Sequence, residues 1–153
     1  MKKRIVFIIL FIFGLDILSK YLVFNHVEYG TSKVLIPNFF ALVPVKNTGA
    51  AFSFFSNNNL ILILISILIL LYILYTLKNL KLTKTTTISY GLIIGGIFGN
   101  LYDRIFLRHV RDFISLKFYK WDFAIFNIAD IAIVVGAILL FILMIRGKMK
   151  YDD

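Results

Sequence analysis

The sequence predicts an integral membrane protein whose fold is an all-α bundle of four transmembrane helices. Its 153 residues are 60% hydrophobic and have a mean hydropathy of +0.90, far above the level of an ordinary soluble domain. Separate apolar windows approach or reach the roughly 20 residues that a helix needs to cross a bilayer. The length suits one compact unit, so we expect residues 1–153 to form a single membrane domain.

The windows that qualify as spans lie at about residues 5–24, 60–77, 88–105 and 126–145. The first follows a basic start and resembles a secretory signal. However, Asp16 interrupts its apolar run and no small-residue cleavage site follows, so we expect a retained span. The second alternates Leu and Ile as a strand would, yet its 18 residues without a charge or a break favour a helix. The third repeats Gly91, Gly95 and Gly99 every four residues, a spacing that lets helices approach closely.

The basic residues indicate which ends of the spans face the cytoplasm. Nine of the 17 Lys and Arg lie in three short segments: before the first span, between the second and third, and after the fourth. The two longer loops, residues 25–59 and 106–125, carry only six. We therefore expect both termini in the cytoplasm and both long loops outside it. The net charge of +9 then reflects topology and attraction to anionic lipid, and it gives no reason to expect nucleic-acid binding.

The two outer loops have unusual content. Residues 34–56, "VLIPNFFALVPVKNTGAAFSFFS", are apolar and aromatic but too interrupted to span. They predict short strands and an amphipathic element lying on the membrane. The second loop, "HVRDFISLKFYKWDFAIF", places several aromatic side chains at interfacial depth.

Polar and ionisable side chains interrupt the spans at one depth, toward the outer side. Asp130 lies about four residues inside the fourth span, with Asn127 on the same helical face. Ionisable groups inside spans usually face the interior of the bundle and are functional by default. The charged and amide side chains in the spans are Asp16, Lys20, Asn100, Asp103, Arg104, Asn127 and Asp130.

Some of these groups also have purely structural explanations. Asp16 and Lys20 are spaced i, i+4 and suit an ion pair, and Asp103 next to Arg104 suits a pair at a helix end. Asp130 is harder to explain in this way, because no cation follows it in its own helix.

The available catalytic chemistry is limited. Cysteine is absent, which excludes disulfides, thiolate metal sites and a cysteine nucleophile. There is no HExxH motif, no His-rich cluster, no G-x-S-x-G and no P-loop, so we expect no metal and no cofactor. Carboxylates near an outer membrane interface remain. Two that lie close together cannot both ionise easily, so one keeps a proton while the other accepts one from water. Such a pair hydrolyses peptide bonds. For Asp112 in "RHVRDF", a surface salt bridge is the simpler alternative.

Five motifs in order along the chain resemble one known family. They are "DILSK" in the first span, "VKNTGAAFS" in the first outer loop, "GGIFGNLYDRI" in the third span, "VRDFI" in the second outer loop and "FNIADIAI" opening the fourth span. Each motif alone is a modest signal, but the set covers nearly the whole chain. The chain resembles the lipoprotein signal peptidases, also called signal peptidase II or prolipoprotein signal peptidases.

The resemblance implies an aspartyl endopeptidase that cuts the signal peptide from diacylglyceryl-modified prolipoproteins, just before the lipidated cysteine. The implied fold is four helices with a small extracytoplasmic β-cradle and a short interfacial helix. By motif, the catalytic pair is Asp112 and Asp130. The positions that bind substrate or shape the site are Asn47, Asn100, Arg104 and Asn127, and those that give structural support are Asp16, Lys20 and Asp103. Arg111 is this chain's own residue within its motif, and we expect its charge to favour the ionised form of Asp112.

The implied partners are the lipidated prolipoprotein and membrane lipid, with no nucleic acid, and we expect a monomer. The implied location is the bacterial cytoplasmic membrane, with multiple spans and the active site on the extracytoplasmic side.

Two other classes of protein remain open from the residues alone. A small proton-coupled transporter or channel subunit would also use intramembrane Asp, Asn and Arg, but an ion path needs polar groups through the whole depth. A structural assembly subunit would pack through the glycine stripe, which leaves the polar cluster without a role.

Overall fold

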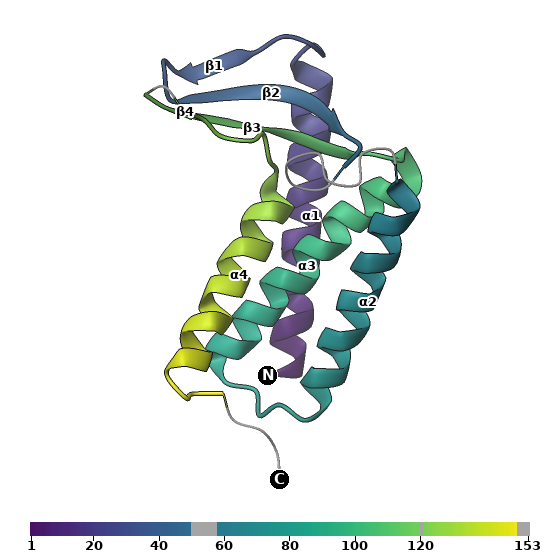
Figure 1. The fold of residues 1–153 in the computed structure, drawn as a ribbon, viewed down its shortest axis with the longest axis vertical. Coiled ribbons are helices and arrows are strands. Elements are labelled where there is room, and N and C mark those ends of the chain that lie inside the picture. Colours follow the sequence, from purple (N-terminus) through teal and green to yellow (C-terminus); the bar gives the residue numbers. More distant parts are fainter. Residues whose placement is uncertain (50–57, 120, 150–153) are drawn as a thin grey trace.

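The protein is a helical bundle with a small sheet at one end (Figure 1). The computed structural model describes residues 1–49, 58–119 and 121–149. Its elements in chain order are α1 (Lys2–His26), β1 (Lys33–Ile36), β2 (Phe40–Asn47), α2 (Asn59–Lys78), α3 (Lys84–Leu107), β3 (Val110–Phe118), β4 (Trp121–Asp122) and α4 (Ile128–Ile145). The start of α1 and the end of α4 both lie at the end of the bundle away from the sheet.

Three of the helices, α1, α2 and α4, are long and apolar enough to cross a membrane. Three of the predicted apolar helices are therefore present. The helix predicted at residues 88–105 is present as α3. It is not among the helices that meet the span criteria within the described part of the chain. Glycines and polar groups make up much of α3, so its membrane crossing stays a prediction.

The predicted strands in residues 34–56 are present, but the expected interfacial helix stays a prediction. Residues 50–56 of that stretch, where it could lie, are outside the described residues. The described strands form one sheet in the order β1-β2-β3-β4, with antiparallel neighbours.

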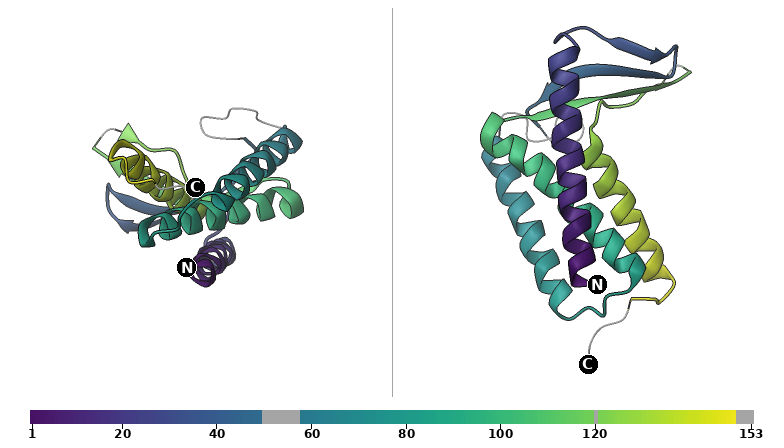
Figure 2. Two further views of the ribbon diagram at one scale, coloured as in Figure 1. Left: turned by 90° about the horizontal axis from the view of Figure 1, so that it is seen from below. Right: turned by 180° about the vertical axis from the view of Figure 1, so that it is seen from behind.

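Helix α3 is the centre of the bundle. Seen along the bundle, α1 lies on one side of α3, and α2 and α4 lie on the other (Figure 2). The glycines explain the close approach. A Cβ on Gly95 would lie 2.9 Å from Cβ of Ile12 in α1, and a Cβ on Gly96 would lie 2.5 Å from the carbonyl oxygen of Ala129 in α4. The prediction that the glycines allow close helix packing is confirmed. Because that packing occurs within one chain, the stripe gives no reason to expect a structural assembly subunit.

The two ends of the bundle differ in polarity. The apolar core lies mainly where α3 begins and α2 ends, around Leu70, Ile73, Ile93 and Ile94. The buried charged side chains of the described residues are Asp16, Lys20, Asp103 and Asp112. All of them lie in the half of the bundle nearer the sheet or in the sheet itself. This arrangement does not provide the continuous path of ionisable groups that a proton-coupled transporter needs.

The pairing of β2 with β3 decides which side chains share a face of the sheet. Val45 is opposite Asp112 and Lys46 is opposite Arg111. Side chains of directly opposed residues point to the same face, and successive residues point to opposite faces. Asp112 therefore lies on one face of β3, and Arg111 with Lys46 lies on the other.

We predict that Gly96→Ala destabilises the protein. The added Cβ would meet a backbone oxygen that cannot move without shifting α4. Overpacking of this kind costs about 1–3 kcal/mol, against a gain of about 1 kcal/mol in helix propensity. The measurement is the thermal unfolding midpoint of the purified protein in detergent. Gly14→Ala is the matched control, because a Cβ there has nothing within 4 Å and should leave the midpoint unchanged or slightly higher. Equal midpoints for the two variants would contradict the close approach of α3 and α4.

Candidate active site

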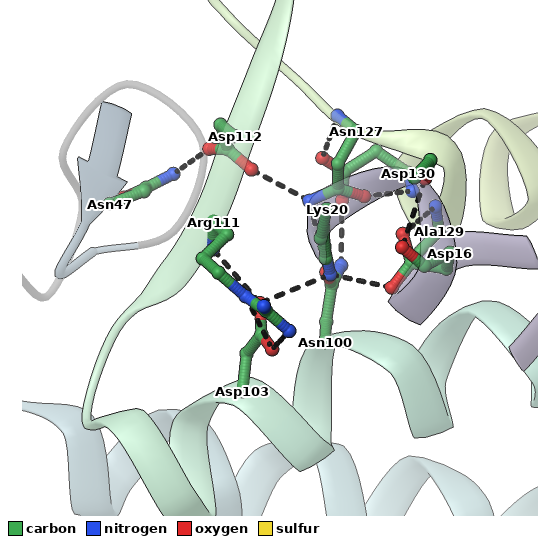
Figure 3. A network of polar contacts seen from close by, with 11 residues as sticks. Asp16, Lys20, Asn47, Asn100, Asp103, Arg111, Asp112, Asn127, Ala129 and Asp130 are labelled. Carbon is green, nitrogen blue, oxygen red and sulfur yellow. Dashed lines mark hydrogen bonds and ion pairs between the residues drawn. The ribbon is translucent and has the colours of Figure 1, made fainter. Parts of the chain in front are cut away.

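Asp112 is held on β3 by two amide donors. Its side chain is buried, and its Oδ2 accepts a hydrogen bond of 2.8 Å from Nδ2 of Asn47 on the neighbouring strand. Its Oδ1 accepts a bond of 2.6 Å from Nδ2 of Asn127 (Figure 3). Because Asn47 comes from β2 and Asn127 precedes α4, this carboxylate sits where the sheet meets the helices. A hydrogen bond to each of its two oxygens fixes its orientation.

Asp130 is fixed by the start of its own helix. Asn127 is the N-cap of α4, and its Oδ1 accepts from the backbone N–H of Asp130 at 2.9 Å. In return, Oδ2 of Asp130 accepts from the backbone N–H of Asn127 at 3.2 Å. This reciprocal capping box satisfies two N–H groups that the helix leaves free, and a carboxylate there also interacts favourably with the helix dipole. The other oxygen, Oδ1, accepts from Nδ2 of Asn100 at 2.7 Å.

The capping box corrects one prediction. The sequence pattern predicts Asn127 on the same helical face as Asp130, but this residue precedes the helix and its backbone is extended. The spacing of an Asn three residues before an Asp, ahead of an apolar run, is the sequence signal for a cap. Asp130 therefore lies in the first helical turn, where a carboxylate is favourable, and not a full turn inside an apolar segment.

Two asparagines connect the carboxylates. Nδ2 of Asn127 donates to Asp112 and also to Oδ1 of Asn100 at 3.1 Å, while Asn100 donates to Asp130. An amide does not titrate, so it can orient a carboxylate without exchanging a proton with it. The asparagines thus fix the positions of Asp112 and Asp130. A proton in this part of the network is held by one of the two carboxyl groups.

Burial changes the acidity of Asp112. The pKa of Asp112 is raised from its usual value of 3.8 to about 6. Removal from water is the largest cause of this increase, and the negative charge of Asp130 is the second. The hydrogen bonds from Asn47 and Asn127 favour the ionised form and offset part of the increase. One member of the pair can therefore hold a proton under mildly acidic conditions, as general acid catalysis requires.

A buried cluster of charged side chains lies next to these residues and contacts them through Asn100. Nζ of Lys20 lies 2.6 Å from Oδ2 of Asp16 and 3.3 Å from Oδ2 of Asp103, and all three side chains are fully buried. Lys20 also donates to Oδ1 of Asn100 at 3.2 Å. The other oxygen of Asp16 accepts from the backbone N–H of Ala129 at 2.9 Å. The cluster therefore joins α1 to α3 and to the first turn of α4.

Arg111 does not act on Asp112 as expected. Its Nη2 lies 2.8 Å from Oδ1 of Asp103, and its Nε and backbone N–H also donate to that carboxylate. The prediction that Arg111 favours the ionised form of Asp112 is wrong, because neighbouring residues of a strand point to opposite faces.

The suggested pair of Asp103 with Arg104 is not what forms. Asp103 pairs with Lys20 and Arg111. Arg104 donates from Nη2 to the carbonyl oxygen of Gly49 at 3.2 Å, just beyond β2. Its charge acts on both Asp130 and Asp112. Arg104 is therefore the cation near Asp112 and Asp130, while Lys20 and Arg111 neutralise the carboxylates of Asp16 and Asp103.

The structure thus brings the predicted site residues into one network. The residues in it are Asp16, Lys20, Asn47, Asn100, Asp103, Asp112, Asn127 and Asp130, with Arg104 beside it. Sequence reasoning missed the part of Arg111 and the backbone N–H of Ala129 in this network. The arrangement supplies a pair of oriented carboxylates, one with a raised pKa, at the junction of sheet and bundle.

The chain is similar in sequence to signal peptidases. The family model for signal peptidase (SPase) II matches residues 8–146. The chain is 42% identical, over 144 residues, to the lipoprotein signal peptidase of Wigglesworthia glossinidia brevipalpis, covering 92% of this chain and 93% of that protein.

Two solved structures have a similar fold. One is a bacterial membrane enzyme determined by the in meso method at 2.3 Å resolution, with a TM-score of 0.87 and 30% identity over 93% of this chain and 87% of that one. The other was determined by the same method at 1.9 Å resolution, with a TM-score of 0.80 and 29% identity over 92% of this chain and 91% of that one.

We predict that Lys20→Met strongly destabilises the protein. The substitution keeps most of the side-chain volume but leaves Asp16 and Asp103 buried without their shared cation. Breaking a buried ion pair by removing one partner costs about 3–5 kcal/mol. The fraction folded can be followed by size-exclusion chromatography and thermal unfolding in detergent. Lys33→Met, at an exposed position of β1, is the matched control. A Lys20→Met protein as stable as this control would show that the cluster does not hold the helices together.

Proposed function

Because this chain belongs to the signal peptidase II family, we propose that it is a membrane aspartyl endopeptidase that cleaves diacylglyceryl-modified prolipoproteins. The cut falls just before the lipidated cysteine. The observation that carries the proposal is the pair of carboxylates, Asp112 and Asp130, oriented by Asn47, Asn100 and Asn127. The amide donors hold two acids in one hydrogen-bonded network, and a pair of carboxyl groups can hydrolyse a peptide bond without a metal or a covalent intermediate.

Hydrolysis proceeds through one water molecule and one proton held by the pair. The ionised carboxylate takes a proton from the water while the water oxygen attacks the scissile carbonyl carbon. The protonated carboxyl donates to the carbonyl oxygen as negative charge develops there. When the tetrahedral intermediate collapses, the carbon–nitrogen bond breaks and the leaving amine receives a proton. The products are a signal peptide with a new carboxylate and a lipoprotein with a free amino group. The proton belongs to the pair, because the two groups titrate together.

The polar residues around the pair have separate roles in this proposal. Asn47, Asn100 and Asn127 shape the site by holding the carboxylates. Arg104 holds the substrate backbone and balances the negative charge of the pair, on which its own charge acts. Asp16, Lys20 and Asp103 support the site without touching the reacting atoms.

We further propose that residues 1–153 form one multi-pass domain in the bacterial cytoplasmic membrane. Helix α3 has 24 residues and lies among three helices able to span, so it crosses with them. The excess of basic residues at the ends away from the sheet supports cytoplasmic termini and an extracytoplasmic sheet. The substrate's signal helix enters between the spans, its lipid chains stay in the bilayer, and the enzyme acts as a monomer.

We predict that Asp112→Asn and Asp130→Asn each reduce cleavage by about 10³-fold or more, because neither variant retains a complete acid–base pair. An Asn at position 130 keeps an oxygen for the capping box, so the helix should still form. The assay is signal-peptide release from a lipidated preprolipoprotein by purified protein in detergent. Glu28→Gln, an exposed carboxyl group beyond the end of α1, is the control and should keep full activity. Full activity of either Asp variant with intact folding would falsify the assignment.

The acidity of Asp112 predicts a pH dependence. Its pKa is raised to about 6, so below that pH the carboxyl group keeps a proton and above it the proton is lost. With both carboxylates ionised the general acid is missing. We therefore expect kcat/KM to fall about tenfold per pH unit well above an apparent pKa near 6 in the free enzyme. Circular dichroism over the same pH range separates this from unfolding. A rate that stays constant from pH 5 to 8 would show that Asp112 does not titrate in this range.

A further inference from the structure

A crevice opens between α1 and α3 on the side of α3 away from α4. It has a volume of about 400 Å³, and Ile17 and Tyr21 of α1 and Arg111 of β3 are among the residues that line it. It continues into a second crevice of about 390 Å³, and both are lined by Phe13 and Tyr102. Both volumes are in the range of ligand pockets, about 300–1,000 Å³.

The two parts of this crevice differ in chemistry. The part nearer the sheet has Arg111 and Tyr21 in its wall. The part farther from the sheet is lined by Ile9, Leu10, Phe98 and other apolar or aromatic side chains. A long groove that is cationic at the headgroup end and apolar toward the bilayer centre matches the profile of a phospholipid lying parallel to the helices.

Gly14 is the second observation that points to a ligand. Glycine is unfavourable in a helix, and the glycines of α3 are explained by the close approach of α1 or α4. Gly14 lines the crevice, and a Cβ added to it would meet nothing within 4 Å among the described residues. Protein packing therefore does not require a glycine at this position. Its effect is to keep the wall of the crevice open.

A second basic residue, Lys46, lies on the strand next to Arg111. Lys46 is directly opposite Arg111 in the sheet, so both side chains point to the face away from Asp112. Burial lowers the pKa of His109, and the nearby charges of Lys46 and Arg111 lower it further, while a backbone hydrogen bond and Asp103 oppose them. Lys46 also lies over the ring of Tyr29, 5.3 Å from its centre, just beyond the end of α1. Aromatic and basic residues together are typical of the headgroup region.

Arg111 retains capacity for an anion. Its Nε and Nη2 form the fork that binds Asp103, so Nη1 is directed away from that carboxylate. Its side chain is 14% exposed, so part of it remains accessible. The charges of Asp16, Lys20, Asp103 and Arg111 sum to zero. Lys46 then adds a net positive charge on the same face of the sheet as Arg111.

We propose that this crevice binds one anionic phospholipid from the leaflet on the side of the sheet. The phosphate lies between Arg111 and Lys46, and an acyl chain follows α1 past Gly14 into the apolar part. The site lies across α3 from Asp130 and is separate from the substrate site. A diacylglyceryl group carries no phosphate, so the two cations would not select it.

The test is native mass spectrometry of the full-length protein in detergent. It is titrated with phosphatidylglycerol and, separately, with phosphatidylcholine that carries the same acyl chains. We expect one phosphatidylglycerol to be retained at a concentration at least tenfold lower than phosphatidylcholine. Gly14→Leu places a side chain in the crevice, starting from a Cβ that meets nothing within 4 Å, and should weaken retention of phosphatidylglycerol at least fivefold. Lys46→Met should remove most of the preference between the two lipids. Lys33→Met, on the edge strand opposite Leu42 and outside the crevice, should change nothing.

Three results would overturn the proposal. The first is equal retention of the two lipids by the unmodified protein, which would indicate ordinary surrounding lipid. The second is unchanged phosphatidylglycerol binding in Gly14→Leu, whose fold is checked by its unfolding midpoint. The third is retention of neutral diacylglycerol as strong as that of phosphatidylglycerol, because the site would then select acyl chains alone.

Discussion

The burial of one ammonium group, that of Lys20, constrains much of this structure. An unpaired charge in a medium of low polarity is so costly that it must find partners. Lys20 finds Asp16 in its own helix and Asp103 and Asn100 in α3. Asp16 in turn binds the backbone N–H of Ala129 at the start of α4. Satisfying this charge therefore fixes the positions of three helices relative to one another. Packing of apolar side chains alone would fix these positions less specifically.

The charge of Lys20 also sets the direction of the hydrogen bonds that reach Asp112 and Asp130, the proposed catalytic pair. A side-chain amide has an acceptor on one branch and donors on the other. Because Asn100 uses its oxygen to accept from Lys20, its nitrogen points to Asp130. Asn127 uses its oxygen for the helix cap, so its nitrogen points to Asp112. Each carboxylate thus receives a donor. The orientation of both amides follows from one buried charge and one helix cap, without any requirement for substrate.

Much of this site could be predicted from the sequence, for reasons that are physical. An ionisable residue in an apolar run must face the interior of the bundle, so Asp16, Lys20 and Asp130 could be grouped by their depth in the spans. The partner of Arg111 could not be predicted, because the pattern does not say which face of β3 meets α3. The start of α4 is indicated only by the spacing of Asn127 and Asp130, because helix boundaries are otherwise uncertain by one or two residues.

The alternation of a strand explains how so short a chain separates two functions. Arg111 and Asp112 are neighbours in sequence, yet one side chain faces α1 and the other faces the start of α4. On a helix, neighbouring side chains would be only about 100° apart and would share much of their surroundings. The two faces remain connected through Asp103, Lys20 and Asn100, each in contact with the next. A change in the ion pair of Arg111 with Asp103 would therefore reach Asp130 only through discrete contacts, first those of Lys20 and then the hydrogen bond that Asn100 donates.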